Sequence, residues 1–254
     1  MNKFKATFVV LIAFAACMLP TTADAVTKVK LLEFGDSLTR EAEPTITAAF
    51  KTNPSYSISV HGQIGMAPCD FLLGITTALD SAANYRLLVL QTAGNSQSPC
   101  MREPGQCARC YMPIGSPEWA AKYRTDLNAI VALAESKGTA VLFVSTPPVA
   151  GVASNRVAVY NTVEPHLALD HPLVVFTDDA RFSVAKPDGS FTATRPCLPG
   201  ETAAVGCVAG RIPVRAPDGL HFCPTGFAIP CPEYSSGAFR FGTAIAISTA
   251  ADLP

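Results

Sequence analysis

Short apolar runs that alternate with longer amphipathic stretches constrain the fold of this chain more than any other feature. Five runs have the length and composition of strands: residues 29–34, 57–60, 86–92, 139–145 and 173–177. Most are continuously apolar, which indicates strands covered on both faces, as in a parallel sheet. Because parallel strands need crossover connections, we expect helices between them. The sequence therefore predicts an α/β fold, a three-layer α/β/α sandwich.

Helical patterns occupy four of the stretches between or after these runs, at residues 69–83, 116–137, 155–169 and 239–250. The second is the clearest, because Ser116 can cap it, Pro117 suits its first position and Gly138 can end it. Pro165 is expected to interrupt the third. The chain has no internal repeat, so we expect a single domain.

The composition excludes several classes of protein. Only 15% of the 254 residues are charged, which excludes a disordered polyelectrolyte. Lysine and arginine number 19 against 20 aspartates and glutamates, for a net charge of −1. No overall positive field exists to hold nucleic acid or an anionic membrane surface, so neither is an expected partner.

The first 25 residues have the pattern of a secretory signal peptide. Lys3 and Lys5 precede an apolar segment at residues 8–19, and small residues at Ala23 and Ala25 form a cleavage pattern. The segment is shorter than the roughly 20 residues of a membrane-spanning helix. We therefore predict a signal peptide at residues 1–25 and one domain at 26–254, with no integral membrane segment after cleavage. A lipoprotein acylated at Cys17 is the alternative.

Cleavage would also change the cysteine count from nine to eight, because Cys17 is removed. An even number in an exported protein fits four disulfides. Seven of the eight lie in two segments without helical or strand periodicity, residues 94–115 and 183–232. Long irregular segments of this kind are uncommon unless they are functional or cross-linked, so we expect disulfide-stapled loops.

Three groups of residues have the chemistry of a nucleophilic active site. Ser37 follows the first strand, at a sheet edge where α/β folds carry their sites. A serine hydroxyl needs a base, and the base needs an orienting group. His221 can serve as the base, and Asp218, three residues earlier, can fix its tautomer. Asn95, after the third strand, can donate a hydrogen bond to an oxyanion.

This combination resembles the GDSL family, also called SGNH hydrolases, from Gly35 to His221. The resemblance implies a flavodoxin-like fold with a five-stranded parallel sheet, and a catalytic triad of Ser37, Asp218 and His221. It also implies an oxyanion hole formed by Ser37, Gly65 and Asn95, with Gly62 as a competitor of Gly65. The block around Asn95 departs from the family pattern, because it lacks the first glycine and the final aspartate.

The cysteine connectivity stays open, because eight cysteines allow many pairings. Local closure favours four pairs: Cys69–Cys100, Cys107–Cys110, Cys197–Cys207 and Cys223–Cys231. The spacing of Cys107 and Cys110 also fits a metal or redox motif. However, no second pair completes a zinc site, and the motif lies in a proline-rich loop. We therefore expect a structural disulfide there and no metal.

The sequence thus predicts a monomeric secreted or periplasmic serine esterase that forms an acyl-enzyme on Ser37. Its substrate would be a small-molecule, lipid or acylated glycan ester, and it would need no cofactor. Two alternatives remain. An acyltransferase would pass the acyl group to a glycan hydroxyl, and a non-catalytic relative would bind glycan or cell wall. The sequence does not identify which of these esters is the substrate.

Overall fold

The structure is a computed structural model that describes residues 28–92, 95–103, 105, 107, 109–151 and 154–252, with side chains at 154–157 left aside. The expected signal peptide at residues 1–25, together with Cys17, lies outside the described residues, and so does Gly94. Among the helices in the described part of the chain, none has the length and apolar character needed to cross a membrane.

The elements alternate in the order expected of an α/β fold. The strands are β1 Val29–Gly35, β2 Tyr56–Gly62, β3 Leu87–Gln91, β4 Ala140–Val144, β5 Val174–Thr177, β6 Thr194–Pro196 and β7 Arg211–Pro213. The helices are α1 Ser37–Lys51, α2 Pro68–Leu79, α3 Pro117–Ser136, α4 Ser154–Asp170, α5 Asp179–Val184 and α6 Ser236–Ala251, with short 3-10 turns η1 Pro99–Met101 and η2 Ala203–Val205. The five predicted strands are therefore confirmed, with bounds shifted by one or two residues.

The main sheet has the order β2-β1-β3-β4-β5, and all four neighbouring pairs are parallel. This is the flavodoxin-like order, in which the chain reverses its direction of strand addition between β1 and β3. The carboxyl ends of these two strands therefore open a crevice where ligands bind in folds of this class. The predicted three-layer sandwich is confirmed.

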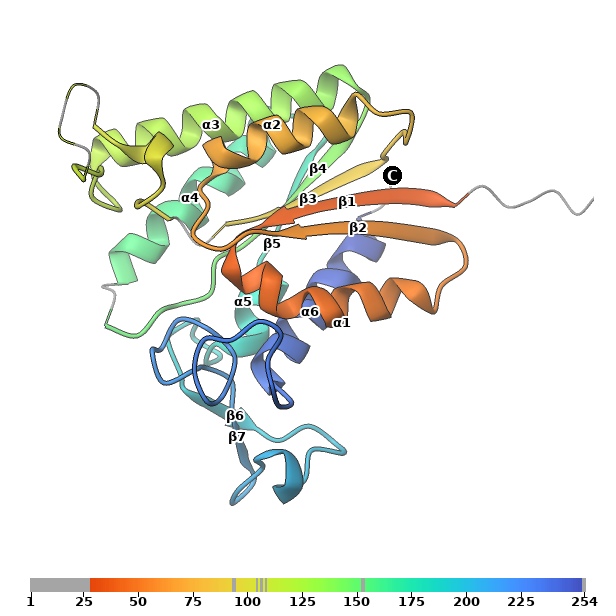
Figure 1. Cartoon of the computed structure of the whole chain (residues 1–254), viewed down its shortest axis with the longest axis vertical. Coiled ribbons are helices and arrows are strands. Elements are labelled where there is room, and N and C mark those ends of the chain that lie inside the picture. Colours follow the sequence, from red (N-terminus) through yellow and green to blue (C-terminus); the bar gives the residue numbers. More distant parts are fainter. Residues whose placement is uncertain are drawn as a thin grey trace, which may run out of the picture.

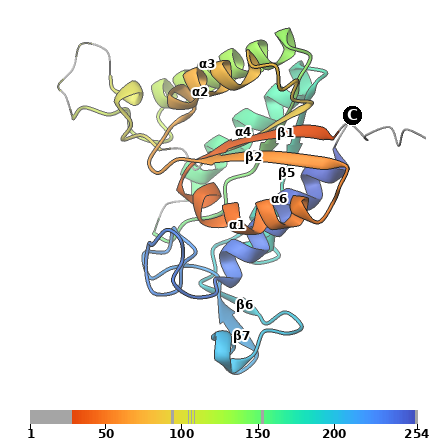
Figure 2. The same cartoon turned by 45° about the vertical axis from the view of Figure 1, so that its right-hand side comes forward.

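Helices cover both faces of the sheet (Figures 1 and 2). On one face, α2, α3 and α4 pack over strand residues such as Phe34 and Phe143. On the other, α1, α5 and α6 pack over residues such as Leu31 and Leu142. Successive strand residues point to opposite faces, so neighbours such as Leu31 and Leu32 enter different cores.

Three helices differ from the sequence expectation, among them the short α5, which lies in none of the predicted helical stretches. Helix α1 was not predicted, because Pro44 and three threonines lower its helix propensity. It forms because Leu38, Ala42 and Ile46, four residues apart, bury one face. Helix α4 continues through Pro165 instead of ending there. Burial of Val163 and Leu167 on either side of the proline offsets the lost backbone hydrogen bond.

A small cap follows α5 and lies outside the sandwich, beyond the N-terminal ends of α1 and α6 (Figures 1 and 2). It contains the antiparallel pair β6–β7, η2 and the long loop before α6. The disulfides Cys197–Cys207 and Cys223–Cys231 close two of its loops. The other two, Cys69–Cys100 and Cys107–Cys110, lie near α2 and before α3. The four pairs coincide with those that local closure favoured.

Candidate active site

Ser37 is the first residue of α1 and lies two residues after the end of β1. Asp36 caps the helix, and its carboxylate accepts a hydrogen bond from the Leu38 amide at 2.9 Å. The turn is tight, because a Cβ at Gly35 would lie 2.0 Å from Thr39 Oγ1 and 3.0 Å from the Gln91 carbonyl oxygen. Only glycine fits there. The turn leaves Ser37 6% exposed at the carboxyl edge of the sheet.

The structure brings Ser37 together with His221 and Asp218, which are far from it in sequence. His221 Nε2 lies 3.1 Å from Ser37 Oγ, and His221 Nδ1 lies 2.7 Å from Asp218 Oδ2. Both distances fit hydrogen bonds. With the Nδ1 proton directed to Asp218, the Nε2 lone pair faces the serine hydroxyl, which is the arrangement of a general base and its nucleophile.

The turn that carries Asp218 orients its carboxylate. Asp218 Oδ1 accepts hydrogen bonds from the backbone amides of Leu220 and His221, at 2.8 and 3.0 Å. Partial burial acts to raise the pKa of Asp218, but the hydrogen bonds from His221 and Leu220 outweigh it and hold this pKa below its usual value. The carboxylate therefore stays ionised beside the imidazole. The turn also contacts the loop after β4, where the Ala150 amide donates to the Gly219 carbonyl.

Two buried charged residues beneath this turn were not predicted from the sequence. Glu41 lies one helical turn after Ser37, and its Oε2 accepts the Phe222 amide at 2.8 Å, directly after His221. Burial raises the pKa of Glu41, against backbone hydrogen bonds and the nearby His221. Arg215 is 4% exposed, with its guanidinium over the Phe222 ring, and burial lowers its pKa to about 9. The sequence offered one signal for Glu41: it follows Ser37 by four residues, which places both on the same face if the segment is a helix.

Gly65 and Asn95, which the resemblance implies as oxyanion donors, lie in the loops after β2 and β3. Asn95 Nδ2 donates to the Met66 carbonyl at 3.1 Å, so its side chain lies against the residue that follows Gly65. Gly62, the competitor, ends β2 and packs on α1, where its Cβ would lie 2.4 Å from Arg40 Cα. This packing explains why residue 62 is glycine, whereas Gly65 lies in the turn beyond the strand with a φ of +72°, a conformation that favours glycine.

Asp70 and a disulfide hold these two loops together. Asp70 Oδ2 accepts hydrogen bonds from the Ala67 amide at 2.8 Å and from the Ser98 hydroxyl. Cys69 and Cys100 are joined in the same place. The sequence predicted the Cys69–Cys100 pair, but it gave no signal for Asp70.

In the described part of the chain, there are two groups of residues whose potential metal-ligand atoms lie close to one another within the group. Glu41 lies beside Cys223 and Cys231, and Asp70 lies beside Cys69 and Cys100. In both groups the two cysteines form a disulfide. Since the thiolate is the metal-binding form of cysteine, neither group has a metal donor set in this state.

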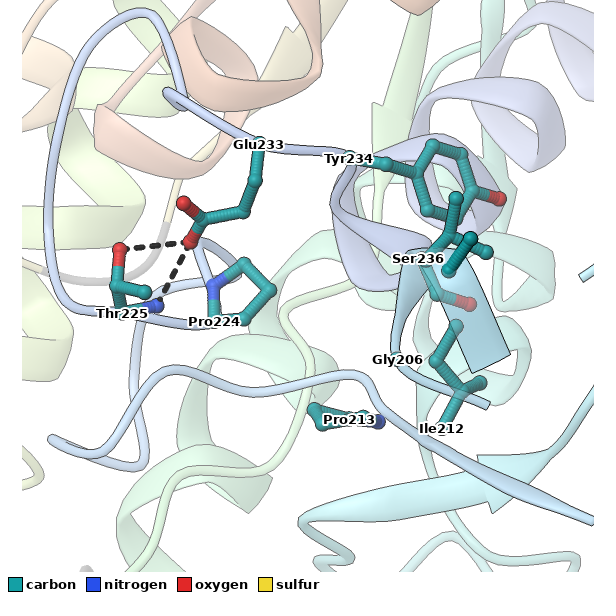
Figure 3. A pocket seen from close by; sticks show the side chains of 10 residues that line it. Gly206, Ile212, Pro213, Pro224, Thr225, Glu233, Tyr234 and Ser236 are labelled. Atoms are coloured by element: carbon teal, nitrogen blue, oxygen red, sulfur yellow. Dashed lines mark hydrogen bonds between the residues drawn. The ribbon is translucent and has the colours of Figure 1, made fainter. Parts of the chain in front are cut away.

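The cap loop also covers the base candidate and borders a separate cavity. The Phe227 ring lies against the His221 ring, with centroids 4.1 Å apart and planes tilted by 40°. Farther along, a cavity of about 370 Å³ is lined by residues of both disulfide-closed loops, including Gly206 and Pro224, and by Tyr234 beyond them (Figure 3). Ser37, Asp218 and His221 do not line this cavity.

The fold is shared with several solved structures. An alpha/beta hydrolase enzyme from the metagenome of Lake Arreo, Spain (LAE5), is 13% identical, with TM-score 0.55, over 89% of this chain and 98% of that one. A GDSL-like lipase from Bacteroides thetaiotaomicron is 16% identical, with TM-score 0.51, over 87% and 88%. The structure titled TesA is 14% identical, with TM-score 0.51, over 88% and 97%. These TM-scores, over most of each chain, show that the fold is the one the resemblance implied.

Sequence comparisons identify the family. A search of curated proteins finds no match to the chain. A family model described as "Protein of unknown function (DUF459)" matches residues 30–229, most of the chain. The matched segment begins in β1 and ends in the cap loop, and it includes Ser37, Asn95, Asp218 and His221. The chain therefore belongs to the DUF459 family.

Proposed function

We propose that this protein is a serine esterase that hydrolyses carboxylic esters through an acyl-enzyme on Ser37. The observation that carries the proposal is the hydrogen-bonded series from Asp218 through His221 to Ser37. Similar folds titled as hydrolases and lipases support it by analogy. The substrate would be a small-molecule, lipid or acylated glycan ester.

The chemistry begins with proton transfer from Ser37 to His221. His221 Nε2 accepts the hydroxyl proton as Ser37 Oγ attacks the ester carbonyl carbon, and Asp218 stabilises the imidazolium that forms. The tetrahedral intermediate collapses when His221 donates this proton to the leaving alcohol oxygen. Water, activated by the same nitrogen, then attacks the acyl-enzyme, releases the acid and restores Ser37.

Three donors are proposed for the oxyanion of the tetrahedral intermediate. The Ser37 amide lies at the N-terminus of α1, where backbone N–H groups and the helix dipole favour negative charge. Asn95 Nδ2 has two hydrogens, one of which Met66 accepts, so its other N–H would face the oxyanion. The Gly65 amide is the third donor.

The same proposal includes export of the protein. Removal of residues 1–25 would leave residues 26–254 as one secreted or periplasmic domain that acts as a monomer. Four disulfides among eight cysteines support an oxidising compartment, because such bonds are rare where thiols are kept reduced.

The Ser37→Ala variant tests the proposal directly. Hydrolysis of short p-nitrophenyl esters should fall by at least about a thousandfold, because the acyl-enzyme cannot form. A fluorophosphonate probe should label the wild type at Ser37 and leave the variant unlabelled. The matched control is Ser190→Ala, at an exposed serine near the cap. Activity that survives Ser37→Ala, or a label found on another residue, would contradict the proposal.

A further inference from the structure

Phe227 is a large apolar side chain that the proposed chemistry leaves unexplained. It is 42% exposed, although the proposed nucleophile and base are nearly covered: Ser37 is 6% exposed and the His221 side chain 14%. Its ring lies on the imidazole of His221, with the two ring centroids 4.1 Å apart. A partly exposed aromatic ring thus adjoins the proposed base.

The loop that carries Phe227 is held at both ends. The Cys223–Cys231 disulfide closes it, and Cys223 is fully buried two residues after His221. Thr225, inside the loop, donates from both its amide and its hydroxyl to Glu233, two residues beyond Cys231, at 3.1 and 2.6 Å (Figure 3). The aromatic ring is therefore presented from an anchored loop.

The proposed reaction places the alcohol portion of the ester beside this ring. His221 Nε2 faces Ser37 Oγ at 3.1 Å, and the same nitrogen must later give its proton to the alcohol oxygen. The alcohol portion therefore lies against the imidazole when it leaves. Phe227 covers the imidazole and is open to solvent, so it is the side chain that this portion meets.

We infer that Phe227 forms the binding surface for the alcohol portion of the ester and selects alcohols with a flat apolar face. This inference rests on the proposed esterase function. An aromatic ring stacks favourably on another ring or on the C–H face of a sugar, whereas a flexible polar chain gains little from it. An aryl-bearing alcohol and a sugar share this chemistry.

Three acetate esters of non-phenolic alcohols test the inference: benzyl acetate, an acetylated methyl glucoside and methoxyethyl acetate. The acyl group is constant, so differences report on the alcohol portion. We expect kcat/KM of the wild type to be highest for benzyl acetate or for the glucoside. The preferred ester shows whether the site takes an aryl-bearing alcohol or a sugar. In Phe227→Leu, this kcat/KM should fall about tenfold, mainly through KM. That of methoxyethyl acetate should change less than about threefold.

The matched control is Phe182→Leu. Phe182 is 40% exposed on α5 and contacts Arg181, so its loss should change none of the three rates. An equal fall for all three esters in Phe227→Leu would show that Phe227 only positions His221, and would overturn the inference. A wild type that hydrolyses all three equally would overturn it too, while leaving the esterase proposal intact. A wild type that reacts with no ester and no fluorophosphonate would overturn both.

Discussion

Ser37 and His221 meet across one hydrogen bond, but different kinds of structure hold them. Ser37 follows β1, which is paired on both sides within the sheet, and begins α1, so regular backbone hydrogen bonds and two cores fix its position. His221 lies on a turn of irregular backbone, held by Asp218, by the Phe222 contact with Glu41 and by a nearby disulfide. Substitutions around Ser37 should therefore affect folding, whereas substitutions around His221 should affect mainly activity.

The carboxyl groups on the two sides show the same contrast. Glu33 on β1 is completely buried, and burial, followed by repulsion from Glu43, raises its pKa to about 8. Asp218 is partly exposed, and its hydrogen bonds hold its pKa below the usual value. Ionisation of Glu33 in the sheet therefore lowers the stability of the fold, whereas the ionised carboxylate of Asp218 in the turn adds to it.

The Gly35→Ala substitution should have the largest effect on the serine side. Its Cβ would overlap Thr39 and press on the Gln91 carbonyl, so we expect a loss of about 3 kcal/mol or more in the free energy of unfolding. Esterase activity should fall to background. Denaturant titration and thermal unfolding give the stability.

The stability control for this substitution is Gly65→Ala. No atom lies within 4 Å of a Cβ at Gly65, so only its backbone conformation, with φ at +72°, opposes the change. That should cost about 1 kcal/mol. Equal stability losses in the two variants would remove the argument that the turn at Gly35 is sterically fixed.

The Glu33→Gln substitution should change how stability depends on pH. In the wild type the folded pKa, about 8, exceeds the ordinary 4.5, so the unfolded chain loses its proton first and stability falls as pH rises between these values. The variant lacks this loss. Its stability relative to the wild type should therefore grow by on the order of 3 kcal/mol from about pH 5 to about pH 8, and stay level above.

Urea titrations at several pH values measure this difference, with Glu43→Gln as the comparison at a partly exposed site. A stability difference between Glu33→Gln and wild type that does not vary with pH would show that Glu33 has an ordinary pKa in the folded protein.

Replacing Cys223 and Cys231 by serine tests the histidine side. Opening a loop of this length should cost about 2 kcal/mol of stability, and kcat/KM should fall at least about tenfold because His221 and Phe227 lose their anchor. The far-UV circular dichroism should remain that of the wild type. The matched control replaces Cys197 and Cys207, which close a loop of similar length away from the triad. If both double variants lose activity equally, the anchoring role of Cys223–Cys231 is wrong.

Apart from the Gly65→Ala control, the Glu41→Leu substitution should have the smallest of these effects on stability. It leaves the buried Phe222 amide without its acceptor, at a cost of about 1–2 kcal/mol, and it loosens the backbone next to His221. Glu41→Gln keeps an acceptor oxygen and should retain most of the stability and kcat/KM. A Gln variant as impaired as the Leu variant would mean that the charge of Glu41, and not its hydrogen bond, is what matters.

The sequence predicted those parts of the fold that depend on local pattern. Continuous apolar runs identified the five strands, and capping residues at Ser116 and Gly138 located α3. Helix α1 was missed, because Pro44 obscured a four-residue apolar spacing that matters only once the helix packs on the sheet. The residues of the candidate site were found because glycine, serine and histidine occur at recognisable places after strands and near the end of the chain.

By itself, the sequence determined the layered α/β fold and the residue types available for nucleophilic chemistry. The tertiary structure decided how they meet: it placed Ser37 and His221, 184 residues apart in sequence, within hydrogen-bonding distance. It also placed Glu41 under Phe222, Asp70 between two loops and Phe227 on the base candidate. The physical reason is that strand periodicity and capping are encoded in neighbouring residues. Burial and contacts across the sheet edge depend on segments that only the folded chain brings together.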